Sequence, residues 1–569
     1  MGLDLGTTAI SATLFNGRTG QSYPIVWSKL EQQRLARATQ QPTIAYLTAD
    51  QPEQPPTATI SVGYAAQAQA DAELLDAIPT GLLLHDFKHY LNLGIPYFSA
   101  QTKTWEPMMQ WSNDWAIALG WFQQALISLL APLNPTHTIE LPCSVEGLSS
   151  ELANAALSQL AGVVVSQPTG WSEAYGFNVR EAVLTAGLVD RPDQVFFLED
   201  PIAALLSALS SVNPSMKTPL TAGTTLVISA GATTTQLLLV NWPSTAEAPT
   251  REDCYLRSLA YAGNAIDQDM ICQLLHPSAR SWERLGFEDL DLPLPGEPDL
   301  PTRYRFQQQL ESTWLGRELV KAVRAAKPGL SQHDRVIFNW EQQQWSLSQR
   351  DWHHRVVLPY LQQLNRELNH LLHQAGATTA SIHQVICWGG TTRMNSIAAW
   401  LQQKLPNATV MPPHPDRSLA LGLARLSQYP KVFDVQRHQY SSYFLLQMIV
   451  KYLSGQPQPV GQILQVLEQH GIDLHLCQSA ILALLEGQLP SGLVATASDL
   501  ALLTPLSQQH PNIQTLSTLS LFSRSGNNTY QLNPQLRALL SQYLAALLTN
   551  TSQTMQKVLT ADFRVEQRQ

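Results

Sequence analysis

Two stretches of the chain, far apart in sequence, share one pattern of apolar and polar positions. Residues 2–15 (GLDLGTTAISATLF) hold an apolar run, a turn at Gly6 followed by two threonines, and a second apolar run. Residues 224–242 (TTLVISAGATTTQLLLVNW) follow the same order around a turn at Gly231. Short apolar runs on both sides of a glycine-containing turn are typical of a β-hairpin. We therefore predict one hairpin in each stretch.

Glycine–threonine turns between strands are common, so either hairpin alone indicates little about function. As a matched pair they indicate two similar lobes that face each other across a cleft. When Gly6 is aligned with Gly231, Asp4 aligns with Ser229. The two turns are therefore alike except that the second lacks the carboxylate of the first.

This pairing suits a nucleotide. A triphosphate held from two sides needs many N–H and O–H donors at close range, which glycine and threonine turns supply. Mg²⁺ keeps several of its waters, so carboxylates can hold it through those waters, and Asp4 is placed to do so. The residues that we expect to hold phosphate are Gly6, Thr7, Thr8, Gly231, Thr233 and Thr234.

Further motifs lie between and after the hairpins. Residues 195–209 (VFFLEDPIAALLSAL) predict a strand and then a helix that starts at Pro201, with Asp200 placed to cap it or to hold water or metal. Residues 385–405 (VICWGGTTRMNSIAAWLQQKL) predict a buried strand, a glycine turn and an amphipathic helix, and the turn could lie against a base or ribose. The stretch HDFKHYLNLG carries one lysine, Lys88, which on its own would be read as a surface residue.

Taken in order, these motifs resemble the nucleotide-binding domain of DnaK-type (heat shock protein 70 family) chaperones, within the actin-like ATPase superfamily. No single motif is decisive, and their common order from residue 1 to about residue 428 carries the resemblance. The segments that carry it are GLDLGTTAI, HDFKHYLNLG, VVVSQPTGWSEAYGFNVREAVLTAGL, LEDPIAAL, LVISAGATTTQLLLV, LAYAGNAIDQDM, VRAAKPGLS, WGGTTRM and HPDRSLALG.

The resemblance implies an α/β, two-lobed actin-like ATPase fold over residues 1–428. Lobe I would span about 1–218 plus 412–428, and lobe II about 219–411. It also implies binding of ATP or ADP with Mg²⁺, catalytic roles for Lys88 and Asp200, and Asp4 as the metal-binding carboxylate. Besides the six phosphate-loop residues, the nucleotide contacts that it implies are Gly263, Lys327, Ser331, Gly389, Gly390, Thr391, Arg393 and Asp416.

The chain departs from the family at the second hairpin. Ser229 and Gln236 stand where the family has two carboxylates, and loss of such a preorganised group costs about 2.7–4 kcal/mol of transition-state stabilisation. ATP hydrolysis is therefore expected to be weak or impaired, whereas binding should suffer less. Arg324 replaces a family Glu that reaches the ribose. Two further segments have their own expectations: an added helix within 138–162, and an exposed, acidic, proline-rich loop at 283–306.

The last third of the chain has a different pattern. Residues 429–569 repeat apolar positions at intervals of three and four, which predicts a mainly helical domain rather than the short alternating strands of a peptide-binding β-sandwich. One hairpin is predicted at 517–534. A winged-helix module that binds DNA would fit this layout, but the charges are sparse and nearly balanced. We therefore expect this domain to contact protein clients or partner proteins.

Composition limits the partners and the cellular location that we expect for this protein. The net charge is −9, only 14% of residues are charged, and no dense Lys/Arg run is present, so nucleic acid is not an expected partner. The five cysteines are scattered with no CxxC pair, and Cys387, which lies in an apolar strand-like run, is expected to be a buried free thiol rather than a metal ligand or part of a disulfide. Residues 115–133 are the most apolar long stretch, and we interpret them as a buried helix rather than a membrane span. With no signal-like start at Met1, the expected location is the cytoplasm and no membrane contact is expected.

Three functional interpretations remain open. The first is an ATP-binding, heat-shock-70-like chaperone or chaperone-like switch with weak or impaired hydrolysis. The second is a non-hydrolysing nucleotide-binding scaffold that acts through its helical C-terminal domain. The third is a sugar or acetate kinase, which the pattern around Lys88 and LEDPIAAL disfavours, and which ATP consumption stimulated by an added sugar would favour.

Overall fold

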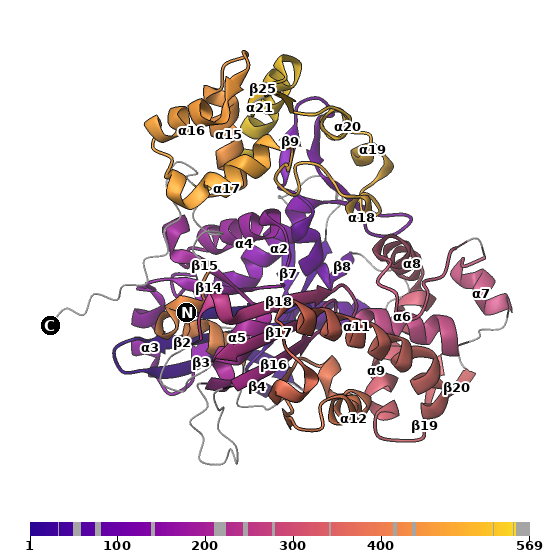
Figure 1. The fold of residues 1–569 in the computed structure, drawn as a ribbon. Coiled ribbons are helices and arrows are strands. Elements are labelled where there is room, and N and C mark those ends of the chain that lie inside the picture. The colour runs from indigo at the N-terminus through magenta and orange to yellow at the C-terminus, as the bar shows by residue number, and fades with distance from the viewer. Residues whose placement is uncertain are drawn as a thin grey trace.

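The chain folds as a mixed α/β protein with several sheets (Figure 1). The computed structural model describes residues 1–31, 34–48, 59–73, 81–137, 143–209, 223–242, 249–275, 279–288, 290–340, 343–413, 418–434, 440–526, 528–549 and 551–553.

The hairpin predicted at 2–15 is present and lies at the centre of the first sheet. Its strands pair antiparallel, and the inner strand also pairs in parallel with β14, which is in turn parallel to β15. The main strand order is β13-β3-β2-β1-β14-β15. These strands are β1 (Gly2–Leu5), β2 (Ala9–Asn16), β3 (Gln21–Glu31), β13 (Cys143–Val145), β14 (Val163–Gln167) and β15 (Val195–Glu199).

The hairpin predicted at 224–242 is also present and occupies the same place in a second sheet. The strand order is β18-β17-β16-β21-β22, with the same antiparallel and parallel neighbours as β3-β2-β1-β14-β15. The two sheets therefore repeat one five-stranded topology. The strands are β16 (Gly223–Ala230), β17 (Thr235–Trp242), β18 (Cys254–Leu259), β21 (Ile382–Trp388) and β22 (Thr409–Met411).

Two helices lie between the sheets. Helix α5 (Asp200–Leu209) follows the first sheet and packs against β16, β17 and β21 of the second, whereas α13 (Leu419–Ala424) follows the second sheet and packs against β1, β2 and β14 of the first. The helices cross closely, because a Cβ on Gly422 would lie 1.8 Å from the carbonyl oxygen of Ala203. Apolar side chains of both helices and both sheets form one buried cluster here.

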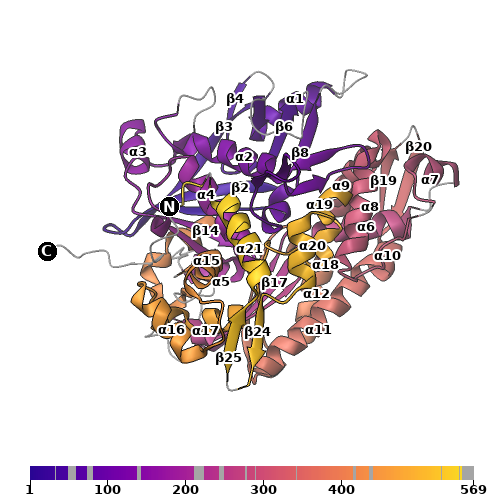
Figure 2. The ribbon, with the colours of Figure 1, turned by 90° about the horizontal axis from the view of Figure 1, so that it is seen from above.

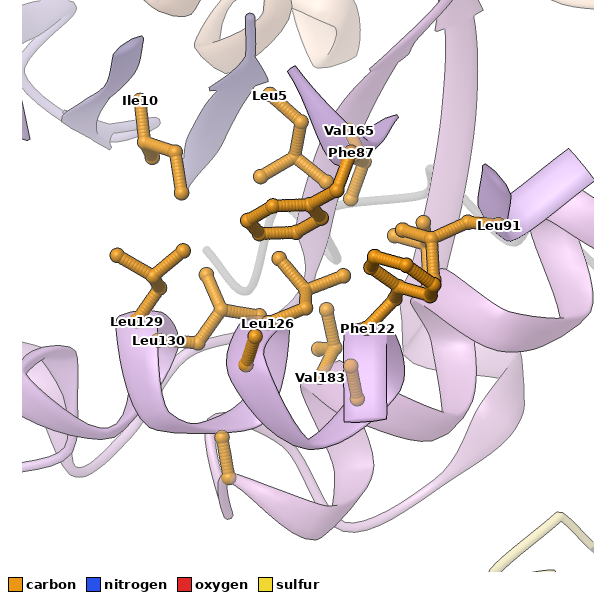
Figure 3. Close-up of a cluster of buried hydrophobic side chains, with 14 of the residues drawn as sticks. Leu5, Ile10, Phe87, Leu91, Phe122, Leu126, Leu129, Leu130, Val165 and Val183 are labelled. Atoms are coloured by element: carbon orange, nitrogen blue, oxygen red, sulfur yellow. The ribbon is translucent and has the colours of Figure 1, made fainter. Parts of the chain in front are cut away.

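The other face of the first sheet is covered by α2 (Leu119–Leu130), α4 (Glu173–Thr185) and the short η1 helix (Phe87–Asn92). Figure 3 shows apolar side chains of these helices meeting those of β1, β2 and β14. Leu5 and Phe87 are nearly fully buried at this junction, so the first hairpin and the segment around Lys88 share one core. The helix predicted at 115–133 is present as α2, which is buried within the protein, but it is shorter than predicted, because residues 116–118 form the strand β12 (Ala116–Ala118).

The C-terminal region is mainly helical and lies above α2 and α4, at the top of Figure 1. The hairpin predicted at 517–534 is present as β24 and β25, and a short strand, β23, adds to it. Among the described residues of this region, no other strand is assigned. The elements are α15 (Ser442–Tyr452), β23 (Gln458–Pro459), α16 (Val460–Gln469), α17 (Leu474–Leu485), α18 (Ala497–Leu500), α19 (Pro505–Gln508), α20 (Pro511–Thr518), β24 (Phe522–Ser525), β25 (Thr529–Leu532) and α21 (Pro534–Leu548).

The C-terminal region is joined to the first sheet's helices through hydrogen bonds. The Glu173 carboxylate, at the start of α4, accepts from the Ser442 N–H at 2.6 Å. At the other end of the region, the Gln553 amide donates to the Phe177 carbonyl at 3.0 Å. Figure 2 shows α15 and α21 lying across α4.

The added helix expected within 138–162 and the loop expected at 283–306 have different outcomes. The segment 138–162 contributes strand β13 and the expected helix, α3 (Ser150–Leu157); residues 138–142 lie outside the described part. The loop expected at 283–306 is wrong at both ends, because residues 283–285 belong to α7 (Ala279–Leu285) and α8 (Leu300–Ser312) begins after Asp299, whose side chain is its N-cap. Arg303 of this helix is buried and ion-paired with Asp269 at 2.9 Å, which an exposed loop would not do.

Cys387 is a buried free thiol, as expected, and the other four cysteines are also free. Within the described segments we find no helix with the length and apolarity needed to cross a membrane.

Candidate functional site

The turns of the two matched hairpins meet. The Thr7 and Thr233 hydroxyl oxygens lie 3.1 Å apart, at hydrogen-bond distance, although the residues belong to different sheets. The first turn is held by Thr43, whose hydroxyl donates to the Gly6 carbonyl at 2.9 Å and whose N–H donates to the Thr8 carbonyl at 3.0 Å. A side chain on Gly6 would lie 2.4 Å from the Ala9 carbonyl, so this turn needs glycine.

The second turn is held from the other side. The Gly231 carbonyl accepts hydrogen bonds from the Gly263 N–H at 3.2 Å and from the Thr391 hydroxyl at 2.7 Å. The Ala232 carbonyl accepts from the Asn264 N–H at 2.7 Å, at the start of α6 (Gly263–Leu274). Because these carbonyls are occupied, the turn is fixed, and Gly231 stays exposed with open space beside its Cα.

A buried charge cluster lies beneath the turns. Burial, and next the neighbouring Asp200 carboxylate, raise the pKa of Asp4 to about 7, although Lys88 acts in the opposite direction. Burial likewise raises the pKa of Asp200, again opposed by Lys88. Lys88 is itself buried, with Nζ 5.5 Å from the centroid of the Trp171 ring and 5.7 Å from that of Tyr175. The cluster therefore holds two carboxylates that are costly to ionise and one lysine.

Gln236 links this cluster to the segment after β14. Its amide donates to Asp200 Oδ2 at 2.8 Å, and its carbonyl oxygen accepts from the Thr169 N–H at 2.7 Å. Asp200 is the first residue of α5 and not the cap before it, so the helix begins one residue earlier than predicted. Its Oδ1 is buried and makes no hydrogen bond with any described residue. Ser229 is buried and pairs with Gln236 in the strand register.

These features fit a hydrated Mg²⁺. Asp200 offers a buried oxygen without a partner, and a cation beside Asp4 would offset the cost of ionising both carboxylates. In the part of the chain that the structure describes, no group of three or more His, Cys, Asp or Glu side chains could ligate a metal directly. A cation held through its own waters needs no such group.

The residues expected on the adenosine side also lie together. Lys327, in α9 (Trp314–Leu330), donates to the Gly263 carbonyl at 2.9 Å and pairs with Asp267 at 2.7 Å. The Ser331 carbonyl, just after α9, accepts from the Asn395 amide at 2.6 Å, close to the turn of Gly389, Gly390, Thr391 and Arg393. Asp416 lies outside the described residues.

Within this turn the two glycines differ. Gly389 has a φ of 90°, and a Cβ there would lie 2.2 Å from the Ala230 carbonyl, so the turn is pressed against the end of β16. Gly390 and Arg393 are exposed, and nothing lies near the Cα of Gly390. This leaves open backbone beside the start of the second hairpin turn, where a flat ring could approach.

Arg324 has a role that sequence reasoning missed. Its guanidinium contacts Asp86, from the loop before η1, at 3.1 Å, and also contacts Asp267 of α6 at 3.4 Å. Arg324 and the His85 imidazole hold the pKa of Asp86 well below its usual range, although burial alone would raise it. The arginine thus joins the first-sheet and second-sheet sides of the site. Asp86 lies two residues before Lys88 in the same motif, which was the available signal.

No family model matches the chain, and a search of curated proteins gives no match either.

Proposed function

We propose that the chain has a two-lobed, actin-like arrangement and binds an adenine nucleotide with Mg²⁺ between its matched hairpins. The observation that carries this proposal is the 3.1 Å contact between Thr7 and Thr233, which brings two equivalent glycine–threonine turns to one place. The repeated five-stranded topology and the helices α5 and α13 between the sheets support the same view. Such turns offer N–H and O–H groups to phosphate.

In this proposal each group has a role. The turns of Gly6–Thr8 and Gly231–Thr234 hold phosphates, and the open backbone at Gly390 lies beside the base. Asp4 and Asp200 hold Mg²⁺ through its waters, and the metal neutralises phosphate charge when bound. Lys88, buried under Trp171, places a fixed positive charge beside the carboxylates.

Hydrolysis is the weaker part of the activity. Ser229 offers no charge at the position where Asp4 stands in the first hairpin, and Gln236 uses its amide and its carbonyl oxygen to hold Asp200 and Thr169. A neutral, occupied pair is a poor means of orienting an attacking water. We therefore propose a cytoplasmic, chaperone-like nucleotide switch with weak or impaired ATP hydrolysis, which contacts protein clients or partners through its helical C-terminal region.

Titration calorimetry with ATP and Mg²⁺ tests the binding step. We expect a saturable heat that Gly231→Leu abolishes, because the leucine side chain would enter the space beside the exposed turn. Gly17→Leu is the matched control, since that glycine also has open space beside it but lies in the turn between β2 and β3. Absence of heat in the wild-type protein would remove the proposal.

A non-hydrolysing scaffold is the second candidate, and one observation favours it. Arg324 already pairs with both Asp86 and Asp267, so the two sides of the site are joined through the protein's own side chains. In this case nucleotide binding would change the structure little, and phosphate release in the presence of ATP would stay at background.

A further inference from the structure

A cavity of about 190 Å³ adjoins the proposed nucleotide site and shares Thr233 and Thr234 with it. It is bounded by η1 and the preceding loop, by α6, and by α8, and the loop that follows α18 closes it through Leu502. It reaches the second hairpin turn only along residues 232–234, and none of the expected adenosine contacts lines it. The cavity therefore meets the proposed nucleotide site at the second hairpin turn and extends away from its adenosine side.

One wall of the cavity is a chain of hydrogen-bonded polar side chains. The Gln268 amide donates to Gln307 at 3.3 Å, the Gln307 amide donates to Glu311 at 2.7 Å, and the His85 Nε2 lies 3.1 Å from the same Glu311 oxygen. The Gln268 amide nitrogen also donates to the Arg303 carbonyl, so Gln268 can offer a ligand only its oxygen, whereas Gln307 and Glu311 keep further hydrogen-bonding capacity. A ligand at this wall can therefore make several hydrogen bonds.

The charges of this wall are already matched. Arg303 pairs with Asp269 at 2.9 Å, and His85 pairs with Glu311. Burial alone would lower the pKa of His85, but Glu311 and Asp86 together raise it to about 10, so this imidazole is charged near neutral pH. A charged ligand would leave one of these pairs with an uncompensated buried charge, which is costly. The wall therefore selects a neutral molecule.

His89 supplies an acceptor without a partner. Its Nδ1 lies 2.8 Å from the Asp86 carbonyl oxygen, which can only accept, so Nδ1 carries the proton and Nε2 is left with a lone pair. Nε2 is buried and makes no hydrogen bond with any described residue. Burial lowers the pKa of His89 to about 4, so the ring stays neutral. Tyr304 stacks on it with centroids 5.5 Å apart, which fixes its orientation.

The rest of the lining is mostly apolar, with Leu93, Trp111, Leu300 and Leu502 contributing apolar surface. Its polar members are Asn92, Thr233, Thr234, Asn264 and Asp499, and the Asp499 carboxylate already accepts hydrogen bonds from the Thr496 N–H and hydroxyl. A pocket with a few converging polar groups among apolar side chains is the usual form of a small-molecule site. A ligand that fits has apolar faces and hydroxyl groups around its edge.

We propose that this cavity binds a neutral monosaccharide. The C–H faces of the sugar ring would pack on the apolar walls, one hydroxyl would donate to His89 Nε2, and others would bond to the Gln268 amide oxygen and the Gln307 amide. Both the first-sheet and second-sheet sides contribute to the wall, so the sugar contacts both. This site does not depend on the proposed nucleotide binding.

Thermal unfolding of the full chain without nucleotide tests this site, with glucose, galactose, ribose and xylose as neutral probes and with adenine and inorganic phosphate as probes of other classes. We expect at least one of the four polyhydroxylated rings to raise the unfolding midpoint in a saturable way. His89→Phe keeps the stacked ring, removes the acceptor, and should weaken that effect at least tenfold in apparent affinity. His354→Phe, at an exposed position, is the matched control and should leave it unchanged.

Hydrogen exchange of the wild-type protein gives a readout that does not depend on any variant. We expect the effective sugar to protect the amides of residues 85–93 and 300–311. The proposal is overturned if none of the four probes binds, if only adenine or phosphate binds, if protection falls elsewhere, or if a folded His89→Phe protein binds as well as the wild type. Failure of ATP binding in calorimetry would leave these outcomes unaffected.

Discussion

At the scale of single residues, the site depends on which of the equivalent positions in the two hairpins carries a carboxylate. Asp4 and Ser229 occupy equivalent places in two hairpins, but only Asp4 is ionisable, and its pKa is raised because it is buried next to Asp200. The second hairpin carries the neutral residues Ser229 and Gln236, and the Gln236 amide donates to Asp200. Because these two side chains carry no charge, they do not repel Asp4 and Asp200, but they also provide no carboxylate that could orient an attacking water.

Ser229→Asp tests whether that loss limits hydrolysis. If the nucleotide is bound as proposed, a carboxylate at 229 restores a preorganised charge beside the phosphates, and we expect ATP turnover to rise by roughly 10²- to 10³-fold. Phosphate release measures it. Ser229→Asn is the control, because it has nearly the same shape without charge and should leave turnover unchanged. A wild-type turnover already equal to that of Ser229→Asp would contradict the argument.

The raised pKa of Asp4 predicts a dependence of stability on pH. Between about pH 4 and pH 7 the folded protein keeps a proton that the unfolded chain has lost, so the free energy of unfolding falls as pH rises, by up to about 1.4 kcal/mol per pH unit. Asp200, whose pKa is raised as well, adds to the slope. Asp4→Asn should reduce this slope in urea unfolding at about pH 5 and about pH 8. An unchanged slope would show that Asp4 is ionised in the folded protein.

At the scale of elements, the close crossing of α5 and α13 decides how the two sheets are joined. Gly422 lies where α13 meets the backbone of α5, and Gly2 of β1 lies under α13 with equally little room, since its Cβ would come 2.2 Å from the Ala420 carbonyl. Backbone therefore packs on backbone through both contacts. A methyl group added at Gly422 must therefore push α13 away from α5, and one added at Gly2 must push β1 away from α13.

Gly422→Ala should therefore destabilise the protein by about 1–3 kcal/mol or more, because neither helix can move without opening the buried cluster between the sheets. The matched control is Gly461→Ala in the exposed part of α16, where a Cβ meets nothing and alanine should stabilise by up to about 1 kcal/mol. Urea unfolding of both variants measures the difference. Equal effects would mean that the crossing is looser than the structure shows.

The elements that sequence reasoning predicted are those with a local pattern. Both hairpins, α2, and the C-terminal helices follow from apolar periodicity and glycine turns, and these signals do not depend on distant partners. Helix α8 was missed because its sequence is polar and follows prolines, and because burial of Arg303 depends on Asp269 in another helix. Arg324 was noticed as a departure, but its contact with Asp86 joins residues more than two hundred positions apart. The motif around Lys88 marks Asp86 as a residue near the site, but nothing local indicates that its partner is Arg324.

At the scale of the whole molecule, the C-terminal region is attached to both sheets' surroundings. Residue Met109 of β11 (Met108–Gln110) forms an antiparallel bridge with Leu503, flanked by the hydrogen bonds Gln110 N–H to Leu502 carbonyl at 2.8 Å and Thr504 N–H to Met108 carbonyl at 3.0 Å. Helix α8, on the second-sheet side, joins the same place, since its Gln308 amide donates to the Ala501 carbonyl at 3.1 Å. Any movement that separates the two sheets must either break these contacts or move the C-terminal region together with them.

A disulfide across the bridge tests whether the C-terminal region leaves its place when nucleotide binds. Residues 109 and 503 form a pair without hydrogen bonds to each other, and Cα atoms in such pairs are about 4.5 Å apart, within the range that a disulfide spans. We expect Met109→Cys with Leu503→Cys to cross-link in most molecules, with and without ATP and Mg²⁺, as measured by mass spectrometry of the oxidised protein. Met109→Cys with Leu506→Cys is the control and should not cross-link, because Leu506 is 82% exposed and directed to solvent. If the first pair cross-links only in one nucleotide state, the region undocks in the other. The bridge would then be part of the switch and not a permanent joint.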